Sequence, residues 1–164
     1  MKYTLLSFAG ACALAMSMQA SAQTCASPLP ISSEGGPHDH VEADLCTAAN
    51  SLSGMGGTPS PGNDVVYSFT ANAANATIDL ALGAEGTWGG NIAGVFLLPT
   101  CSDSTDPIAF GFPGTPMQVT GLADGQDYFI VVTSDPGAPA TTCGTFQVDV
   151  TGTLPVVVQN FVVE

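Results

Sequence analysis

Apolar and polar residues alternate along several short stretches of the chain, and a period of two residues is typical of β-strands that bury one face. In one stretch Phe146, Val148 and Val150 alternate with polar residues, so their side chains are expected on one buried face. Two other stretches are apolar throughout, as expected of strands covered on both faces. The pattern predicts strands at Asp64–Ala71, Thr77–Leu82, Ile92–Leu98, Gln118–Leu122, Tyr128–Thr133, Thr145–Thr151 and Val156–Val163.

The segments between these strands are rich in residues that form turns. The chain holds 19 glycines and 12 prolines, and no stretch has apolar residues at helical spacing over three turns. We therefore predict an all-β protein built as an antiparallel, jelly-roll-like β-sandwich. Loops are expected at Ser53–Gly62, Cys101–Pro107 and Ser134–Thr142. Gln23–Gly62 has weak periodicity, and one or two short edge strands are expected within it.

The first 22 residues have the three parts of a secretory signal peptide. Lys2 supplies a positive charge, Leu5–Met18 is mostly apolar, and Ala20-Ser21-Ala22 forms a small-residue cleavage site. A membrane anchor is the alternative, but the apolar run is shorter than the roughly 20 residues that span a bilayer. The protein is therefore expected to be secreted, at the cell surface or periplasmic. We predict a signal peptide at residues 1–22, the sandwich domain at 23–152 and a strand or tail at 153–164.

Four cysteines follow the predicted signal peptide: Cys25, Cys46, Cys101 and Cys143. An even number of cysteines in an exported chain predicts two disulfides. Three pairings are open, and we favour Cys25–Cys46 with Cys101–Cys143 because each pair then falls within one half of the chain. A metal site is the alternative, although no Cys-x-x-Cys spacing occurs.

The charge of the chain is strongly unbalanced. It has 14 acidic residues and one basic residue, Lys2, so the part after the predicted signal peptide has no Lys or Arg and a formal charge of −14. Phosphate backbones are bound through cationic side chains, and an anionic lipid surface would repel this chain. Neither nucleic acid nor an anionic membrane surface is therefore an expected partner. The carboxylates either keep the protein soluble or bind cations.

Residues suited to catalysis are scarce. The only histidines are His38 and His40, and no Gly-x-Ser-x-Gly motif is present. The four cysteines are expected to be oxidised, which removes them as nucleophiles. We predict that the chain is not an enzyme, with a hydrolase that uses one of the two histidines as the less favoured alternative.

Two groups of residues have metal-binding chemistry. His38 and His40 are followed by Glu42 and Asp44, and an extended chain would put all four on one face, where imidazole and carboxylate suit zinc, copper or nickel. An exposed polar loop is the alternative. Carboxylates in loops suit calcium, although no EF-hand spacing occurs. They are Asp103, Asp106, Asp124, Asp127 and Asp135. No cofactor is expected to be required, and Ca²⁺ is the candidate ion at these loop carboxylates.

Two further features bear on partners. Trp88 lies in Gly86-Thr87-Trp88-Gly89-Gly90, where an exposed indole would stack on a polysaccharide, and packing under a loop is the alternative. Val156–Val163 is expected to pair as an edge strand. Self-association, or recognition by a protein partner through strand addition, is the alternative for this segment.

Five segments, taken in their order along the chain, carry a family resemblance: Cys25–Pro30, Asn63–Thr70, Ile92–Ser102, Gly121–Val132 and Cys143–Val150. Together they resemble the bacterial pre-peptidase C-terminal family, whose members are small jelly-roll-like sandwiches appended to secreted proteases and other exported proteins. The chain departs from the family in having no protease domain and in having Asn91 where an Asp is more usual. Leu122, Gly125 and Tyr128 also match the tyrosine corner of immunoglobulin-like and fibronectin-like sandwiches, which are the alternative folds.

These features predict an exported, non-catalytic β-sandwich module with a binding, adhesion or accessory role. A calcium-binding surface and a structural subunit are the alternatives. The expected partner is a polysaccharide or a protein.

Overall fold

The computed structural model describes residues 24–31, 38–86, 88, 93–134 and 141–154. The predicted signal peptide, Asp135 and Val156–Val163 lie outside these residues. Within them, no helix is long and apolar enough to cross a membrane.

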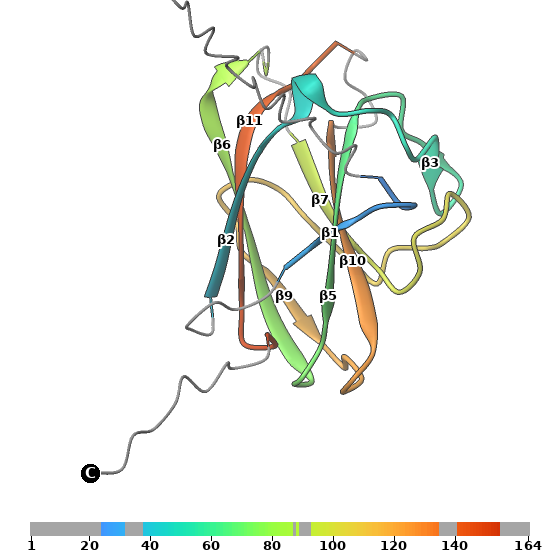
Figure 1. Ribbon diagram of the computed structural model, residues 1–164, viewed down its shortest axis with the longest axis vertical. Coiled ribbons are helices and arrows are strands. Elements are labelled where there is room, and N and C mark those ends of the chain that lie inside the picture. Colours follow the sequence, from blue (N-terminus) through green and yellow to red (C-terminus); the bar gives the residue numbers. More distant parts are fainter. Residues whose placement is uncertain (1–23, 32–37, 87, 89–92, 135–140, 155–164) are drawn as a thin grey trace, which may run out of the picture.

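Two β-sheets face each other and form the predicted sandwich (Figure 1). The strands of the five-stranded sheet are, in order, β1 (Leu29–Pro30), β5 (Asp64–Thr70), β10 (Asp127–Ser134), β7 (Ala93–Leu98) and β8 (Ala109–Gly111). Those of the four-stranded sheet are β2 (His38–Asp44), β11 (Gly144–Thr151), β6 (Asn75–Gly86) and β9 (Met117–Thr120). A hairpin and a 3-10 helix complete the described elements: β3 (Gly54–Met55), β4 (Thr58–Pro59) and η1 (Leu45–Thr47).

The strands follow the alternation of the sequence closely. Six of the seven predicted strands are confirmed, and β6 is longer than expected because it continues to Gly86. β1 and β2 lie at sheet edges, as expected for the segment before Gly62. Two features were not predicted: the β3–β4 hairpin, which lies inside the expected loop Ser53–Gly62, and β8.

The inward faces of the two sheets make the main hydrophobic core. Tyr67 and Ile130 from the five-stranded sheet are fully buried, as are Ile78 and Val148 from the four-stranded sheet. Burial raises the pKa of the Tyr67 phenol, which stays neutral in this apolar setting. The core is therefore built from the alternate positions that the sequence pattern identifies.

A second, smaller cluster covers part of the outer face of the five-stranded sheet. Val66, Leu98 and Val131 point outward from β5, β7 and β10, and Leu52 and Met55 cover them. This third layer explains why these strands are apolar on both faces. In Figure 1 the β3 hairpin lies on this outer side, away from the four-stranded sheet.

The disulfides join Cys25 to Cys101 and Cys46 to Cys143, so the pairing favoured from the sequence is wrong. Asp44 of β2 pairs with Thr145 of β11, and the same ladder continued by two residues brings Cys46 opposite Cys143. The favoured pairing assumed that neighbours in sequence are neighbours in space. In this sandwich, β2 instead pairs with the last described strand.

Asp64 anchors the segment that crosses the outer face. Its Oδ2 accepts hydrogen bonds from the backbone N–H groups of Ser51, at 2.9 Å, and Leu52, at 2.8 Å. Its own N–H donates to the carbonyl of Ala49. Burial raises the pKa of this carboxyl, and the two backbone hydrogen bonds offset part of that effect.

The loop before β10 has the geometry of a tyrosine corner. The backbone N–H of Ala123 donates to the Tyr128 hydroxyl at 3.0 Å, and the Tyr128 ring is buried against Phe69. The motif at Leu122–Tyr128 therefore forms the contact that its sequence predicts.

Replacing Cys46 and Cys143 together with Ser should lower the free energy of unfolding by about 4–5 kcal/mol, because the bridge closes a long loop in the unfolded chain. Urea denaturation measures this loss. Peptide mapping of the wild-type protein without reductant should recover Cys25 linked to Cys101. A peptide that joins Cys25 to Cys46 would contradict the described pairing.

The Asp64 carboxyl should make the protein less stable as pH rises. Its pKa is raised in the folded state, so the folded protein binds this proton more tightly than the unfolded chain does. The resulting stabilisation is present below the pKa of the unfolded state and is lost as pH rises through the folded value. Asp64→Asn should reduce the dependence of the melting temperature on pH, measured from pH 3 upward.

Asp124→Asn is the matched control, because it removes one acidic group from an exposed position. Its melting temperature should follow the wild-type pH dependence. Equal pH dependence in the two variants would show that Asp64 does not cause the loss of stability with rising pH.

Candidate binding surface at the β8 edge

The residues around β8 place their large apolar side chains outward. Ile108, Phe110 and Phe112 are 50%, 63% and 42% exposed, and the small residues Ala109 and Gly111 lie between them. We call these three exposed side chains the aromatic edge. A strand on a sandwich ordinarily buries its large residues, so this strand has the reverse arrangement.

Close packing explains why the inward residues of β8 are small. Gly111 pairs with Val95 of β7. A Cβ atom at Gly111 would lie 3.0 Å from the Cβ of Met117 and 3.4 Å from Cγ1 of Val95. A larger residue there would push β8 away from the core.

The aromatic rings form a connected row on the outer surface. Phe96 of β7 pairs with Phe110 of β8, and their ring centroids are 6.4 Å apart. The rings of Phe110 and Phe112 meet edge to face at 6.0 Å. The Phe96 ring lies over Gly94, where a Cβ atom would come within 2.6 Å of it. These contacts hold the rings in place before any partner arrives.

A groove of about 370 Å³ separates the aromatic edge from the β3–β4 hairpin. Met55 and Gly56 form part of one wall, and Phe96 and Phe110 part of the other. Asp106 is the charged residue among those that line the groove. A second hollow of about 550 Å³, which reaches Met117 and Gln118, lies along the aromatic edge. The surface therefore combines exposed rings, adjacent hollows and one carboxylate.

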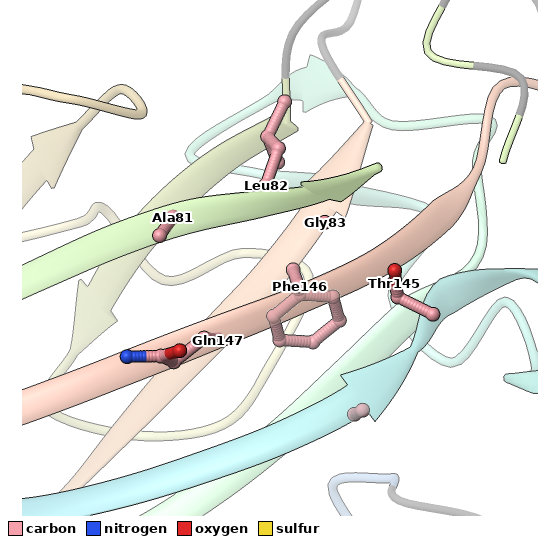
Figure 2. Close-up of a pocket in the computed structure, with 7 residues that line it drawn as sticks. Ala81, Leu82, Gly83, Thr145, Phe146 and Gln147 are labelled. Atoms are coloured by element: carbon pink, nitrogen blue, oxygen red, sulfur yellow. The ribbon is translucent and has the colours of Figure 1, made fainter. Parts of the chain in front are cut away.

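A third hollow, of about 400 Å³, lies on the four-stranded sheet (Figure 2). Ala81 and Gly83 of β6 line it together with Thr145 and Gln147 of β11. The small residues on β6 leave space beside the longer side chain of Gln147. This hollow lacks the exposed rings of the β8 edge.

The carboxylates predicted to bind calcium are spread over the described loops. Asp103 accepts hydrogen bonds from the N–H and hydroxyl of Ser53, and Asp127 accepts one from the hydroxyl of Thr70. Asp106 lines the groove, and Asp124 is exposed in the turn before β10. Among the side chains that the structure describes, no group of three His, Cys, Asp or Glu residues could hold a metal ion. Calcium binding at these positions stays a prediction.

His38 and His40 lie in β2, so this segment is an extended strand. Their side chains lie outside those that the structure describes. Asp44, the last residue of the predicted set, caps η1 by accepting a hydrogen bond from the N–H of Cys46 at 2.8 Å.

Trp88 is partly buried and packs against the main core. Its indole nitrogen is buried and has no hydrogen-bond partner among the described residues. Trp88 is therefore packed, which is the alternative to an exposed platform for a sugar. Its position does not support sugar stacking.

The aromatic edge is not predicted by the sequence pattern. The signal is present as Ile108-Ala109-Phe110-Gly111-Phe112, in which large and small apolar residues alternate. The surrounding prolines and glycines favour a loop, and the pattern lacks the polar positions that usually mark the solvent face. The large residues are exposed because Gly111 packs inward against Met117 and Val95, and this contact cannot be read from the sequence.

No known family pattern matches the chain, and no curated protein matches it. Solved structures do share its fold. One is PliG of Aeromonas hydrophila, a periplasmic inhibitor of g-type lysozyme, at 11% identity and a TM-score of 0.51, with 75% of this chain and 93% of that chain covered.

Two other solved structures are similar at a TM-score of 0.44 each. They are the Yersinia pseudotuberculosis-derived mitogen (9% identity, 70% of this chain and 84% of that chain) and the pre-peptidase C-terminal domain of a Bacillus anthracis collagenase (20% identity, 75% and 93%). Membership of the pre-peptidase C-terminal family stays a prediction.

Two substitutions should separate the inward and outward faces of β8. Gly111→Val should lower the free energy of unfolding by about 1–3 kcal/mol, because its side chain would overlap Met117 and Val95. Phe110→Ser, on the outer face, should change it by less than about 1 kcal/mol. Thermal melting of both variants checks this, and a larger loss in Phe110→Ser would mean that the ring belongs to the core.

Proposed function

We propose that the chain is an exported, non-catalytic binding module that captures a positively charged protein through the aromatic edge. The observation that carries the proposal is the outward arrangement of Ile108, Phe110 and Phe112 on a strand at the end of its sheet. Fixed aromatic side chains beside a hollow are the features that dominate binding energy at protein interfaces. β8 also offers its outer backbone edge for strand addition by a partner.

The charge of the chain favours a cationic partner. The part after the predicted signal peptide has 14 acidic residues and no Lys or Arg, and Asp106 lies in the groove beside the rings. Lys or Arg side chains of a partner would bind over the faces of Phe96 and Phe110 and reach this carboxylate. A neutral polysaccharide would gain nothing from the overall negative charge.

Further observations support an extracytoplasmic, non-catalytic role. The two disulfides suit an oxidising compartment, and a protein of similar fold, PliG, is a periplasmic lysozyme inhibitor. That fold is therefore compatible with binding another protein outside the cytoplasm. The resemblance to the pre-peptidase C-terminal family implies the same class of appended, exported module. Asp64 and Tyr67, whose pKa values burial raises, lie in the interior and do not line the groove.

The test uses the oxidised chain from Gln23 onward and a panel of purified lysozymes with basic isoelectric points. Each lysozyme is also used after succinylation, which reverses its lysine charges. We expect at least one native lysozyme to bind, more tightly at 50 mM than at 300 mM salt, and its succinylated form not to bind. Phe110→Ser with Phe112→Ser should weaken binding at least tenfold, as measured by biolayer interferometry.

Thr120→Ser, an exposed change on the other sheet, is the control and should bind as the wild type does. Binding that survives loss of both rings would place the contact elsewhere, and binding to no basic lysozyme would contradict the proposal as tested. Ring-dependent retention on chitin or peptidoglycan would show a polysaccharide site instead. Oligomers that disappear when residues 155–164 are deleted would show that Val156–Val163 of a second copy occupies the edge.

A further inference from the structure

The groove beside the aromatic edge differs in charge from the neighbouring hollow. Asp106 lines the groove together with the rings of Phe96, Phe110 and Phe112, and the rest of the described lining is uncharged. The hollow that reaches Met117 shares two of these rings and has no charged residue among the described residues that line it. Of the two hollows, the groove is therefore the one suited to a cation.

The loop that carries Asp106 is fixed to the β3–β4 hairpin by three hydrogen bonds. The N–H of Gly56 donates to the carbonyl of Thr105 at 3.0 Å. The N–H and the hydroxyl of Ser53 donate to the carboxylate of Asp103 at 3.2 Å and 2.6 Å. Figure 1 shows the hairpin beside the loop that follows β7. The backbone next to Asp106 is therefore held in place before any ligand enters the groove.

Two glycines leave space in the groove. Gly56 has a φ of 55°, a backbone conformation that favours glycine. A Cβ atom at Gly56 would overlap Asp106 Oδ1, so the carboxylate lies directly against the turn of the hairpin. Gly94 of β7 also lines the groove and has no side chain to fill it. A side chain that enters the groove can therefore reach both the carboxylate and the rings.

The charge of Asp106 has no lysine or arginine partner within the chain. Beyond Lys2, in the predicted signal peptide, the chain has no Lys or Arg. Asp106 is exposed, and the apolar groove beside it has a lower dielectric constant than open water. A cation in the groove is therefore attracted to this carboxylate more strongly than it would be in open solvent. An amino-acid cation of this kind has to come from another molecule.

We propose that the groove is a socket for one arginine side chain of the partner, and that Asp106 is the residue that selects it. This inference rests on the proposed function and names the group that the site recognises. A guanidinium is planar, so it can stack on an aromatic ring and donate two hydrogen bonds to one carboxylate. The aliphatic carbons of the arginine would lie against the apolar lining, which includes Met55.

A lysine side chain fits the same surroundings less well. Its ammonium group is a compact and strongly hydrated charge, and it lacks the flat face that stacks on a ring. The rings are fixed at 27° between Phe96 and Phe110 and at 81° between Phe110 and Phe112. A planar group therefore meets ring surfaces that are already ordered, which favours arginine over lysine.

The experiment titrates the ¹⁵N-labelled, oxidised chain from Gln23 onward with three acetylated and amidated peptides, Gly-Leu-X-Leu-Gly. X is arginine, lysine or citrulline, which has nearly the shape of arginine but no charge. We expect the arginine peptide to bind at least tenfold more tightly than the citrulline peptide and at least threefold more tightly than the lysine peptide. NMR shifts measure the affinities, and the amides of Gly56 and Phe110 should be among those that move.

Substitutions separate recognition of the cation from general contact with the rings. Asp106→Asn should weaken binding of the arginine peptide at least threefold and reduce its preference over citrulline, because the ring contacts remain and the charge pair is lost. Phe110→Ser should weaken binding of all three peptides. Asp124→Asn removes an exposed carboxylate from another loop, so this matched control should keep the wild-type affinities.

Equal affinity for the arginine and citrulline peptides would overturn the proposal, and so would the absence of any shift up to about 10 mM arginine peptide. Equal affinity for arginine and lysine would overturn the selection of arginine. An unchanged arginine preference in Asp106→Asn would mean that the cation binds elsewhere, which also overturns the proposal.

These outcomes are distinguishable from a failure of the proposed function. Arginine binding in the groove without capture of any lysozyme would leave the socket standing and contradict the proposed partner. Capture of a lysozyme that depends on Phe110 and Phe112, without a preference for the arginine peptide, would remove the socket alone.

Discussion

The apolar contact between the two sheets is the interaction on which the rest of the structure depends. Beyond Lys2 the chain has no Lys or Arg, so its carboxylates have no such partners to pair with. Leu97 and Ile130 from one sheet and Ile78 and Leu80 from the other are almost completely buried. Each such side chain contributes roughly 1.5–3 kcal/mol relative to exposure. The two disulfides add covalent links to this packed fold.

The outer face of the five-stranded sheet is covered over only part of its width. Leu52 and Met55 cover Val66, Leu98 and Val131, and the Cys25–Cys101 bridge lies beside this cluster. Toward β8 the cover ends, and the same face continues as the exposed aromatic edge. One apolar surface is thus divided into a covered part and an exposed part. The opposite sheet is different, since β6 and β11 carry polar residues on its outer face, among them Asp79 and Asp149, which lie opposite each other.

Local sequence patterns predicted most of the strands, but they did not predict which strands lie side by side. β5 and β11 follow from alternation because each residue's face depends only on its parity in the strand, and β10 follows from a continuous apolar run. The partner of Cys46 depends on which strand lies beside β2, and nothing in the sequence around Cys46 points to Cys143. β8 was missed because its inward residues are small and its outward residues large. The opposition of Asp79 and Asp149 likewise appears only once the register of β6 and β11 is known.

The Cys46–Cys143 bridge at the end of the β2–β11 ladder also fixes the register of the two strands. A slip of β2 by one residue would separate the two sulfur atoms and turn every side chain of the strand to the opposite face. The Cys46–Cys143 bridge therefore forms in one alignment of β2 on β11 and excludes alignments shifted by one residue. This edge strand is held at one end by a covalent bond as well as by the backbone hydrogen bonds of its ladder.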